Sequence, residues 1–326
     1  MADAPKAFVI GHPIAHSRSP LIHRHWLAER GAPGSYEAVD VAPDDLAAWL
    51  DALDPAEWRG GNVTVPHKEH VRAWLGESVD DDARAIGAVN TLWHDGVRWV
   101  GGCTDGTGFI ANLDEGAPGW REGAVERGAL VIGAGGAARA IVHALAGLGI
   151  AVTVANRTVA RAEALVEEFG LNGACGLGGV ADAVRGTGLV VNASSLGMSG
   201  VRPGAALPAG AVADQVEAPH LDPAVLSLAH TPPPPATAPA GRAANRRTPA
   251  AGRAVVGRMP APDAVGSDIV YAPLRTPFLA AAEAAGLRTV DGLGMLLHQA
   301  VPGHARWFGV RPEVTPGLRA AVEATL

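Results

Sequence analysis

The sequence predicts an α/β fold of two domains, and three observations support this prediction. The 326 residues are enough for two hydrophobic cores, at 48% hydrophobic and 18% charged residues. Short apolar runs that end at glycine or proline alternate with longer amphipathic stretches, as strands alternate with helices. In the middle of the chain this alternation is regular, which predicts a parallel sheet with right-handed crossovers.

Composition and charge exclude several classes of protein. A net charge of −7 argues against a chain that binds nucleic acid along its whole surface. Two cysteines, Cys103 and Cys175, are too few for a disulfide framework and suit a reducing compartment. The apolar stretch 129–155 contains Arg139 and His143, so strand, turn and helix explain it better than a membrane span. With no secretory signal at the start, we expect a cytoplasmic protein that binds neither membranes nor nucleic acid.

Residues 1 to about 105 mix strands and helices. An apolar run at 7–10 predicts the first strand, and Ser19-Pro20 predicts a helix with Ser19 as its N-cap. Residues 62–65 alternate polar with apolar, so Asn62 and Thr64 are expected to point to the same side of a strand. Further strands are expected at 36–41, 88–93 and 97–100, and a helix is expected to begin at Asp44 and Asp45.

A glycine loop marks a candidate nucleotide site. A buried strand at 129–132 leads into it, and a helix follows to about residue 148. The loop consists of Gly133, Ala134, Gly135, Gly136, Ala137 and Ala138, in which the first, third and sixth positions match G-x-G-x-x-G/A. Glycines let the backbone approach a pyrophosphate, and the helix N-terminus supplies N–H donors. On this motif alone, a tight turn without a ligand is the alternative.

The end of the next strand indicates which nucleotide would bind. The strand at 151–154 is followed by Asn156, Arg157 and Thr158, where an NAD site usually has an acid for the ribose hydroxyls. Arginine at this place suits the 2′-phosphate of NADP. Arg161 would close on the same phosphate, or would lie on a solvated helix face. Further elements are expected as a strand at 189–192 and helices at 161–169, 280–285 and 295–300.

The segment from about residue 207 to 263 breaks the alternating pattern. It contains four consecutive prolines at 232–235, many alanines, and arginines with no acid between Asp222 and Asp263. We expect a largely disordered insertion; a partner-binding role for its arginines is the alternative. Two segments of similar sequence, 211–219 and 264–273, lie near the start and just after the end of this segment. Of these, 268–273 is the expected sheet strand, because Ile269 and Tyr271 are apolar where its counterpart has Gln215 and Glu217.

Lys68 and Asp105 are the candidate acid–base pair of the first domain. Lys68 follows the strand at 62–65, and Asp105 stands in Cys103-Thr104-Asp105. On spacing alone, a surface salt bridge explains the two residues better. Four histidines near the start suggest a metal site, but a hydride transfer needs no metal, and none is expected; they are His12, His16, His23 and His25.

Several ordered blocks of the chain resemble the shikimate dehydrogenase family. They are residues 11–20 (GHPIAHSRSP), 61–68 (GNVTVPHK), 88–92 (AVNTL), 133–138, 156–158, 268–271 (DIVY) and 291–299 (DGLGMLLHQ). The resemblance covers essentially the whole chain except the insertion. It implies a substrate-binding and catalytic domain of residues 1–105, completed by C-terminal helices at 292–326. Residues 106–291 would form a Rossmann-type NADP-binding domain with a parallel sheet, carrying the insertion.

The resemblance also implies an activity and a set of site residues. Enzymes of this family reduce 3-dehydroshikimate to shikimate with NADPH, on the route to aromatic amino acids. At matching positions, Lys68 and Asp105 would be the catalytic pair. The substrate-binding residues would be Ser17 and Ser19 for the carboxylate, Asn62, Thr64, Asn90 and Gln299 for the ring hydroxyls, and Tyr271, which would close the site. The alternatives are a helix cap for Ser19, a turn residue for Asn90 and a core residue for Tyr271.

Two departures from the family pattern leave rival functions open. Cys103 stands where the family usually has asparagine, and a thiol cannot replace the amide hydrogen bonds, so a looser loop before Asp105 is expected. The insertion comes just before the strand that carries Tyr271. The rivals are a quinate/shikimate dehydrogenase of broader specificity and a catalytically impaired, nucleotide-binding regulatory protein. For either enzyme the partner is a small-molecule substrate, and the protein is expected to be a monomer or a homodimer.

Overall fold

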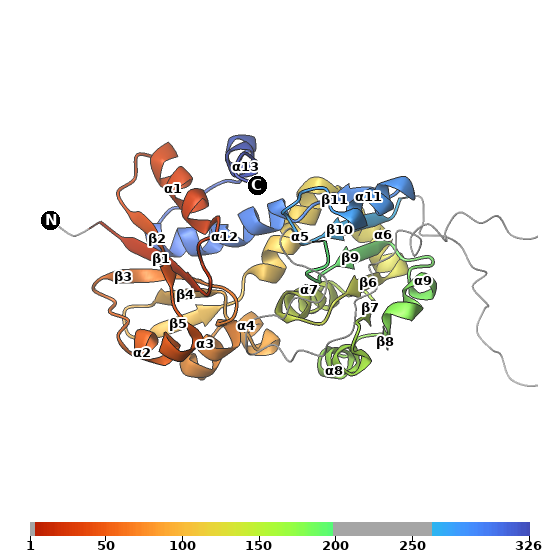
Figure 1. Ribbon diagram of the computed structural model, residues 1–326, viewed down its shortest axis with the longest axis horizontal. Coiled ribbons are helices and arrows are strands. Elements are labelled where there is room, and N and C mark those ends of the chain that lie inside the picture. The colour runs from red at the N-terminus through yellow and green to blue at the C-terminus, as the bar shows by residue number, and fades with distance from the viewer. Residues whose placement is uncertain (1–3, 198–262) are drawn as a thin grey trace, which may run out of the picture.

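The computed structural model describes residues 4–197 and 263–326 and contains two β-sheets, one in each half of the molecule (Figure 1). The α/β class predicted from the sequence is confirmed. The expected insertion at about 207–263, including the segment 214–219 that repeats the pattern of 268–273, lies outside the described residues except for Asp263.

The first sheet is mixed, with the strand order β2-β1-β3-β4-β5. Strand β1 pairs in parallel with β2 and with the central strand β3, while β3, β4 and β5 pair antiparallel. The strands expected at 88–93 and 97–100 form a hairpin that turns at Asp95, whose carboxylate accepts the Val97 and Arg98 amides at 2.8 and 2.9 Å. The strands are β1 (Lys6–Gly11), β2 (Ser35–Asp40), β3 (Trp58–Val63), β4 (Thr91–His94) and β5 (Trp99–Gly102).

Helices cover both faces of this sheet. Phe8 and Ile10 of β1 pack toward α2, α3 and α4, whereas Ala7, Val9 and Tyr36 face α1 and α12. The helices are α1 (Ser19–Glu29), α2 (Leu46–Asp51), preceded by the 3₁₀ turn η1 (Pro43–Asp45), α3 (Lys68–Leu75), α4 (Asp81–Ile86) and α12 (Leu293–Phe308). Helix α13 (Pro316–Glu323) packs against α1 and α12.

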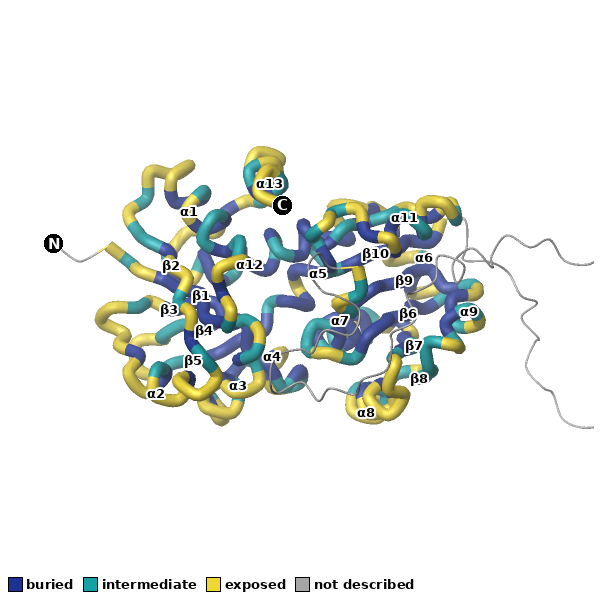
Figure 2. Tube along the Cα trace, viewed as in Figure 1, coloured by how far each residue is buried: buried dark blue, intermediate teal, exposed yellow. Residues whose placement is uncertain are grey.

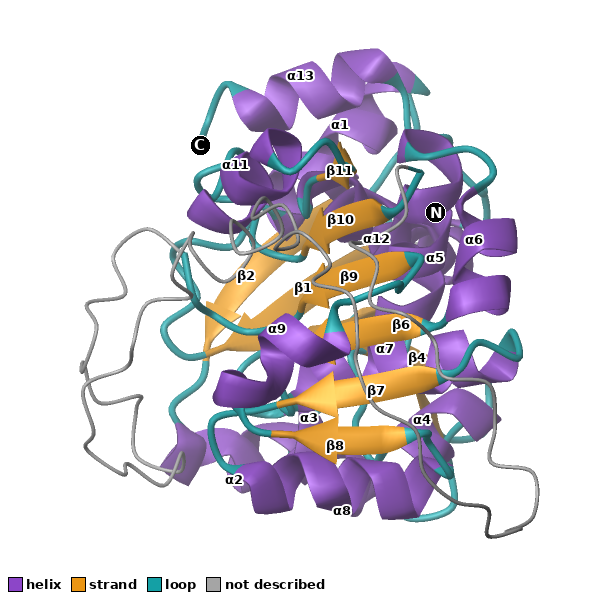
Figure 3. Ribbon diagram, turned by 90° about the vertical axis from the view of Figure 1, so that its right-hand side faces the viewer, coloured by secondary structure: helices purple, strands orange, loops and turns teal. Residues whose placement is uncertain are grey.

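The second sheet is entirely parallel, as the alternating pattern predicted (Figure 3). Its order is β11-β10-β9-β6-β7-β8, so the chain reverses its winding direction beside β6, where nucleotide sites of such sheets lie. The strands are β6 (Ala129–Ile132), β7 (Val152–Ala155), β8 (Gly173–Cys175), β9 (Leu189–Asn192), β10 (Val265–Asp268) and β11 (Arg288–Val290).

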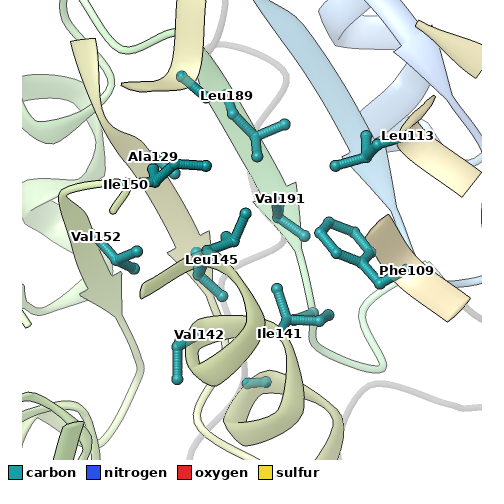
Figure 4. Close-up of a cluster of buried hydrophobic side chains, with 14 of the residues drawn as sticks. Phe109, Leu113, Ala129, Ile141, Val142, Leu145, Ile150, Val152, Leu189 and Val191 are labelled. Atoms are coloured by element: carbon teal, nitrogen blue, oxygen red, sulfur yellow. The ribbon is translucent and has the colours of Figure 1, made fainter. Parts of the chain in front are cut away.

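Successive residues of β6 face opposite layers of helices. Ala129 and Val131 pack with Phe109 and Ile141 in one apolar cluster, part of which Figure 4 shows. Leu130 and Ile132 belong to a cluster on the other face, so the strands are buried on both sides (Figure 2). The helices are α5 (Asp105–Gly116), α6 (Trp120–Arg127), α7 (Gly136–Gly147) and α8 (Val159–Phe169) on the first face, and α9 (Val180–Ala183), after the turn η2 (Leu177–Gly179), and α11 (Pro277–Ala284) on the second.

Helices α5 and α12 pack along one another and bring distant parts of the chain together. Gly108 permits this close contact, because a Cβ built on it would lie 2.6 Å from the Cβ of Gln299. The C-terminal helix α12 thereby places Gln299 beside the start of α5, where Asp105 lies.

Three local predictions were wrong in position. The N-cap of α1 is Arg18, and Ser19 is the first helical residue, with Pro20 in the first turn. The strand expected at 268–273 ends at Asp268, and β3 ends at Val63, so Thr64 follows that strand instead of belonging to it. Across the residues that the structure describes, no helix is long and apolar enough to cross a membrane.

Candidate active site

Lys68 and Asp105 form a direct ion pair. The Lys68 Nζ lies 2.5 Å from the Asp105 Oδ2, although the residues are far apart in the sequence. Each sits in the first turn of a helix, Lys68 in α3 and Asp105 in α5. Their side chains are only 22% and 10% exposed, so this is not the well-solvated surface salt bridge that spacing alone favoured.

The Asn90 side chain links this ion pair to neighbouring elements through hydrogen bonds. Its Nδ2 donates to the Asp105 Oδ1 at 2.7 Å, and its Oδ1 accepts the Thr104 amide at 2.9 Å. The same Nδ2 lies 3.4 Å from the Gln299 Oε1, while the Thr104 hydroxyl donates to the Gln299 carbonyl at 2.8 Å. The structure thus brings together four of the predicted residues, Lys68, Asp105, Asn90 and Gln299. Thr104 completes the network, and the sequence analysis missed it although it precedes Asp105 directly.

The charge state of the pair follows from its surroundings. Burial by itself lowers the pKa of Lys68, but the charge and hydrogen bond of the Asp105 carboxylate outweigh it, and the pKa lies above its ordinary value. Lys68 is therefore a cation at neutral pH. Burial, with Asp105 second, raises the pKa of Cys103 to about 12, so that side chain stays a neutral thiol. Cys103 packs into the apolar cluster of the first sheet.

Ser17 and Ser19 lie at the start of α1. The Ser17 Oγ accepts the Ser19 amide at 3.3 Å, and Ser19 is buried whereas Ser17 is partly exposed. Ser17 also lines a pocket of about 520 Å³, together with Arg18, Arg24 and Thr325. Since Arg18 occupies the N-cap position, the alternative interpretation of Ser19 as a helix cap does not hold.

Asn62 and Thr64 lie at the end of β3. Asn62 is buried, and its Nδ2 donates to the Asn90 carbonyl at 3.2 Å, which connects it to the network around Asp105. Thr64 is partly exposed in the loop that leads to Lys68. The Thr64 amide donates to the Ile10 carbonyl, so this loop is held against the end of β1.

Tyr271 lies three residues beyond the end of β10 instead of within a strand. It is partly buried and packs against the apolar cluster formed by α1, α12 and α13. Burial raises the pKa of its hydroxyl. Tyr271 therefore follows a strand of the second sheet but contacts helices that cover the first, at the junction of the two halves.

The loop that presents Tyr271 depends on a buried carboxylate that the sequence analysis did not identify. Asp268 is fully buried and accepts from the Asn192 Nδ2 at 3.0 Å, the Thr276 hydroxyl at 2.6 Å and the Val270 amide at 3.0 Å. These bonds join the ends of β9 and β10 to the start of α11. Asp268 is the first residue of the segment 268–271 that resembles the family, and this match is the sequence signal that could have identified it.

The glycine loop has the form that a dinucleotide requires. Gly133 directly follows β6 with φ +122°, and a Cβ on it would lie 2.8 Å from the Ala193 carbonyl oxygen, so glycine is needed there. A Cβ on Gly135 or Gly136 would meet no atom within 4 Å, which leaves open space beside the N-terminus of α7. Ala138 is fully buried and lets α7 pack against the sheet. Ala134 and Ala137 complete the loop and are partly exposed.

The residues after β7 can receive an anion. The Asn156 side chain donates to the Thr158 carbonyl at 2.9 Å and shapes the turn, and Thr158 is the N-cap of α8. Arg157 and Arg161 are both exposed. Within residues 4–197 and 263–326, neither guanidinium pairs with a carboxylate. Two exposed arginines thus follow β7, Arg157 in the loop and Arg161 in the first turn of α8.

The N-terminal histidines have separate surroundings. The His12 Nδ1 lies 2.8 Å from an Asp40 carboxylate oxygen, while His23 is buried against His304. In the part of the chain that the structure describes, no three His, Cys, Asp or Glu side chains gather as metal ligands would.

Comparisons with known proteins agree with this geometry. Residues 9–92 match the family model "Shikimate dehydrogenase substrate binding domain", and residues 122–197 match "Shikimate / quinate 5-dehydrogenase". The chain is 48% identical to a shikimate dehydrogenase (NADP⁺) of Brucella melitensis, over 100% of this chain and 96% of that protein. It is 47% identical to a protein of the same name from Mesorhizobium japonicum, over 98% and 96%.

Solved structures are similar over the same length. The shikimate 5-dehydrogenase of Thermus thermophilus, in complex with NADP(H) and shikimate, matches with a TM-score of 0.73 at 33% identity, covering 99% of this chain and 100% of that one. The quinate dehydrogenase of Corynebacterium glutamicum, in complex with NAD, matches with a TM-score of 0.73 at 26% identity, covering 99% of each chain. With a parallel dinucleotide-binding sheet, a buried lysine–aspartate pair and full-length relatives of this identity, the chain belongs to the shikimate dehydrogenase family.

Proposed function

We infer that this protein catalyses the reversible, NADPH-dependent reduction of 3-dehydroshikimate to shikimate, a step in the biosynthesis of aromatic amino acids. One observation carries the inference: Lys68 and Asp105, 2.5 Å apart, share a hydrogen-bond network with Asn90 and Gln299. This is a partly buried acid–base pair surrounded by amides that suit a hydroxylated ring. It occurs in a chain 48% identical to an enzyme named for that activity.

NADP(H) is the cofactor that the second sheet fits. The pyrophosphate would lie beside Gly135 and Gly136 at the N-terminus of α7, where the backbone leaves open space. Arg157, with Arg161 one helical turn later, would neutralise the 2′-phosphate. When bound, NADPH supplies the hydride for the carbonyl carbon.

Lys68 and Asp105 handle the charge that develops on the substrate oxygen. Because the pKa of Lys68 is raised, the side chain is protonated and can donate its proton to the forming alkoxide. Asp105 keeps the ammonium group in place and is itself oriented by Asn90. In the reverse direction the same pair accepts the proton of the substrate hydroxyl.

The remaining polar residues recognise the substrate. Ser17 and Ser19 at the start of α1 would bind its carboxylate. Asn62, Thr64, Asn90 and Gln299 would hold its ring hydroxyls, and Tyr271, at the junction of the two halves, would close the site.

We also propose the division into domains that the sequence suggested. The first domain would comprise residues 1–105 with helices from about 292 to 326, and the NADP-binding domain would comprise residues 106–291. The two sheets and the separate family matches at 9–92 and 122–197 support this division. A cytoplasmic monomer or homodimer remains the expected state.

The quinate-specific and the impaired alternatives make different predictions. The exposed Arg157 favours NADP over NAD, while the amide network around Asn90 does not distinguish shikimate from quinate. The intact Lys68–Asp105 pair argues against an impaired protein, even with Cys103 before it.

An absorbance assay at 340 nm tests the proposal. Purified protein with shikimate and NADP⁺ should form NADPH, and 3-dehydroshikimate with NADPH should consume it. Turnover with quinate and NAD⁺ at higher kcat/KM would favour the quinate enzyme. Nucleotide binding without any turnover would indicate the regulatory protein.

A further inference from the structure

A chain of buried polar side chains lies behind Asn62, which the proposed function places among the substrate-binding residues. The Tyr36 hydroxyl donates to the Asn62 Oδ1 at 2.6 Å, and the Asn62 Nδ2 donates to the Asn90 carbonyl at 3.2 Å. Tyr36 is fully buried, and Asn62 is 5% exposed. A flipped amide would turn its nitrogen toward the Tyr36 hydroxyl and its oxygen toward the carbonyl of Asn90. The Asn90 carbonyl, which can only accept, therefore selects one orientation of the Asn62 amide, and the Tyr36 hydroxyl holds the Asn62 oxygen in that orientation.

Tyr36 in turn packs against His23 of α1, and His23 is held by His304 of α12. The His23 ring of α1 stacks on the Tyr36 ring, with 4.1 Å between centroids and 17° between planes. The His23 Nδ1 lies 3.0 Å from the Nδ1 of His304 in α12, so one of the two nitrogens donates to the other. Both histidines are almost fully buried. The position of Tyr36 therefore depends on how α1 packs against α12.

The protonation states keep this arrangement polar but uncharged. Burial lowers the pKa of His23 well below its ordinary value, with His304 adding to the effect and Asn62 opposing it. Burial raises the pKa of Tyr36, so its oxygen carries the proton that Asn62 accepts. Among the described residues, the His23 Nε2 is buried without a hydrogen-bond partner. A buried nitrogen without a partner lowers the stability of the fold, and an apolar ring would fill the same space without that cost. A purely structural role therefore does not explain a histidine at this position.

We propose that Tyr36 and His23 are positioning residues for substrate binding, which set the orientation of the Asn62 amide toward a ring hydroxyl. The inference rests on the proposed function, because it acts through the role of Asn62 in that site. The Tyr36 hydroxyl occupies one lone pair of the Asn62 oxygen, and Asn90 takes one amide hydrogen. The Asn62 Nδ2 also lies 3.5 Å from the Thr91 hydroxyl, so it is the second lone pair of the Asn62 oxygen that keeps a fixed direction and remains for a substrate hydroxyl.

A double-mutant cycle with Tyr36→Phe and Asn62→Ala tests the proposal. Tyr36→Phe removes the hydroxyl and keeps the ring that stacks on His23. We expect kcat/KM for shikimate to fall about tenfold in Tyr36→Phe, mainly through KM, with KM for NADP⁺ unchanged. In the Asn62→Ala background the same substitution should change kcat/KM less than twofold. Equal losses in both backgrounds, or an equal rise in KM for NADP⁺, would overturn the proposal.

Two further variants keep the test decisive. His23→Phe keeps a ring against Tyr36 and removes both ring nitrogens; its loss of kcat/KM should likewise vanish in the Asn62→Ala background. If Tyr36→Phe does not fold, the His23 cycle decides alone. Thr187→Val is the matched control, because it removes a buried hydroxyl that donates to the Val184 carbonyl in the other half of the molecule. Its KM for shikimate should not change.

The parent protein separates this inference from the proposed function. Absence of any turnover of shikimate by the parent would contradict the function itself. Normal turnover by the parent and by Asn62→Ala would overturn only the role of Asn62 and its positioning residues.

Discussion

At the scale of single residues, the chemistry depends on which charges are compensated. Lys68 faces one carboxylate at 2.5 Å in a partly buried place, whereas Arg157 and Arg161 are exposed. A partly buried ammonium group that is held by one carboxylate suits proton transfer, because the carboxylate fixes the position from which the proton is donated. An uncompensated, exposed arginine suits a phosphate that arrives from solvent.

Lys68→Ala should lower kcat by about 10²- to 10⁴-fold, the usual contribution of a positioned acid–base group. Steady-state assays with shikimate and NADP⁺ measure this, and KM for shikimate should change much less. Lys6→Ala is the matched control, since Lys6 is the other lysine of the chain and pairs with exposed Glu57. A Lys68→Ala enzyme within threefold of the parent would remove Lys68 from the mechanism.

Arg157→Ala should weaken NADPH binding roughly 10- to 150-fold and leave NADH binding nearly unchanged. The reason is that a charge-assisted hydrogen bond contributes about 1.5–3 kcal/mol and only NADPH has the 2′-phosphate. Titration of nucleotide fluorescence measures both affinities. Arg185→Ala, which loses an exposed arginine paired with Asp182, should change neither affinity. Equal weakening for both nucleotides would contradict the assignment.

At the scale of elements, helix α12 is longer than the sequence analysis predicted. The expected helix at 295–300 stopped before Pro302, yet α12 continues to Phe308. Its last turns are anchored by Trp307, whose indole nitrogen donates to the Leu92 carbonyl at 2.8 Å, and by His304 against His23. Tertiary packing thus overrides the local cost of proline within a helix.

The contact between α1 and α12 predicts how stability depends on pH. Burial, with Arg30 second, lowers the pKa of His304 from 6.5 to about 4. The unfolded chain therefore takes up the proton first as pH falls, and the contribution present above pH 6.5 is lost between pH 6.5 and 4. At 1.36 kcal/mol per unit, this single group accounts for about 3 kcal/mol.

His304→Phe should reduce that decline, because phenylalanine has a similar shape and no proton to gain. Urea unfolding of both proteins at pH 7 and pH 4.5 measures the difference. His16→Phe, at an exposed position, serves as the control. An unchanged slope in His304→Phe would show that other groups cause the decline.

β10 shows why a strand can be misplaced by its apolar residues. The prediction favoured 268–273 because Ile269 and Tyr271 are apolar, but β10 comprises Val265–Asp268 and ends in two polar residues. Asp268 is tolerated there because Asn192, Thr276 and the Val270 amide satisfy its oxygens. Only the Val270 amide is local to Asp268; Thr276 lies at the start of α11 and Asn192 at the end of β9, so the pattern around Asp268 does not reveal these two partners.

At the scale of the whole molecule, the two halves also meet between α4 and α7. The Arg139 Nε of α7 donates to the Ile86 carbonyl at the end of α4, at 2.7 Å, and the same guanidinium pairs with Glu168 of α8. A single side chain therefore links a helix of the first sheet to two helices of the second.

Arg139→Met should lower the free energy of unfolding by about 1.5–3 kcal/mol, since it removes charged hydrogen bonds and leaves the Ile86 carbonyl without this donor. Urea denaturation measures the change. Arg121→Met is the control: its ion pair with Asp114 is about half exposed and lies within one half, so the loss should stay below about 1 kcal/mol. Equal losses in the two variants would show that Arg139 contributes no more than a surface pair.

By itself, the sequence determined the α/β class, the parallel sheet, the glycine loop and the identity of most candidate site residues. These features follow from local patterns: apolar periodicity, glycines before a helix, and an arginine after the next strand. Family resemblance then related Lys68 to Asp105, which spacing alone could not do.

Only the tertiary structure decided which polar groups meet. The Lys68–Asp105 distance, the amide network that Asn90 and Thr104 form with Gln299, and the buried chain from His304 to Asn62 all join residues from separate elements. Their positions depend on how helices pack across a sheet, and small residues such as Gly108 permit that packing. Hydrogen bonds need atoms within about 3 Å of one another, whereas sequence patterns specify only which face of an element a residue occupies.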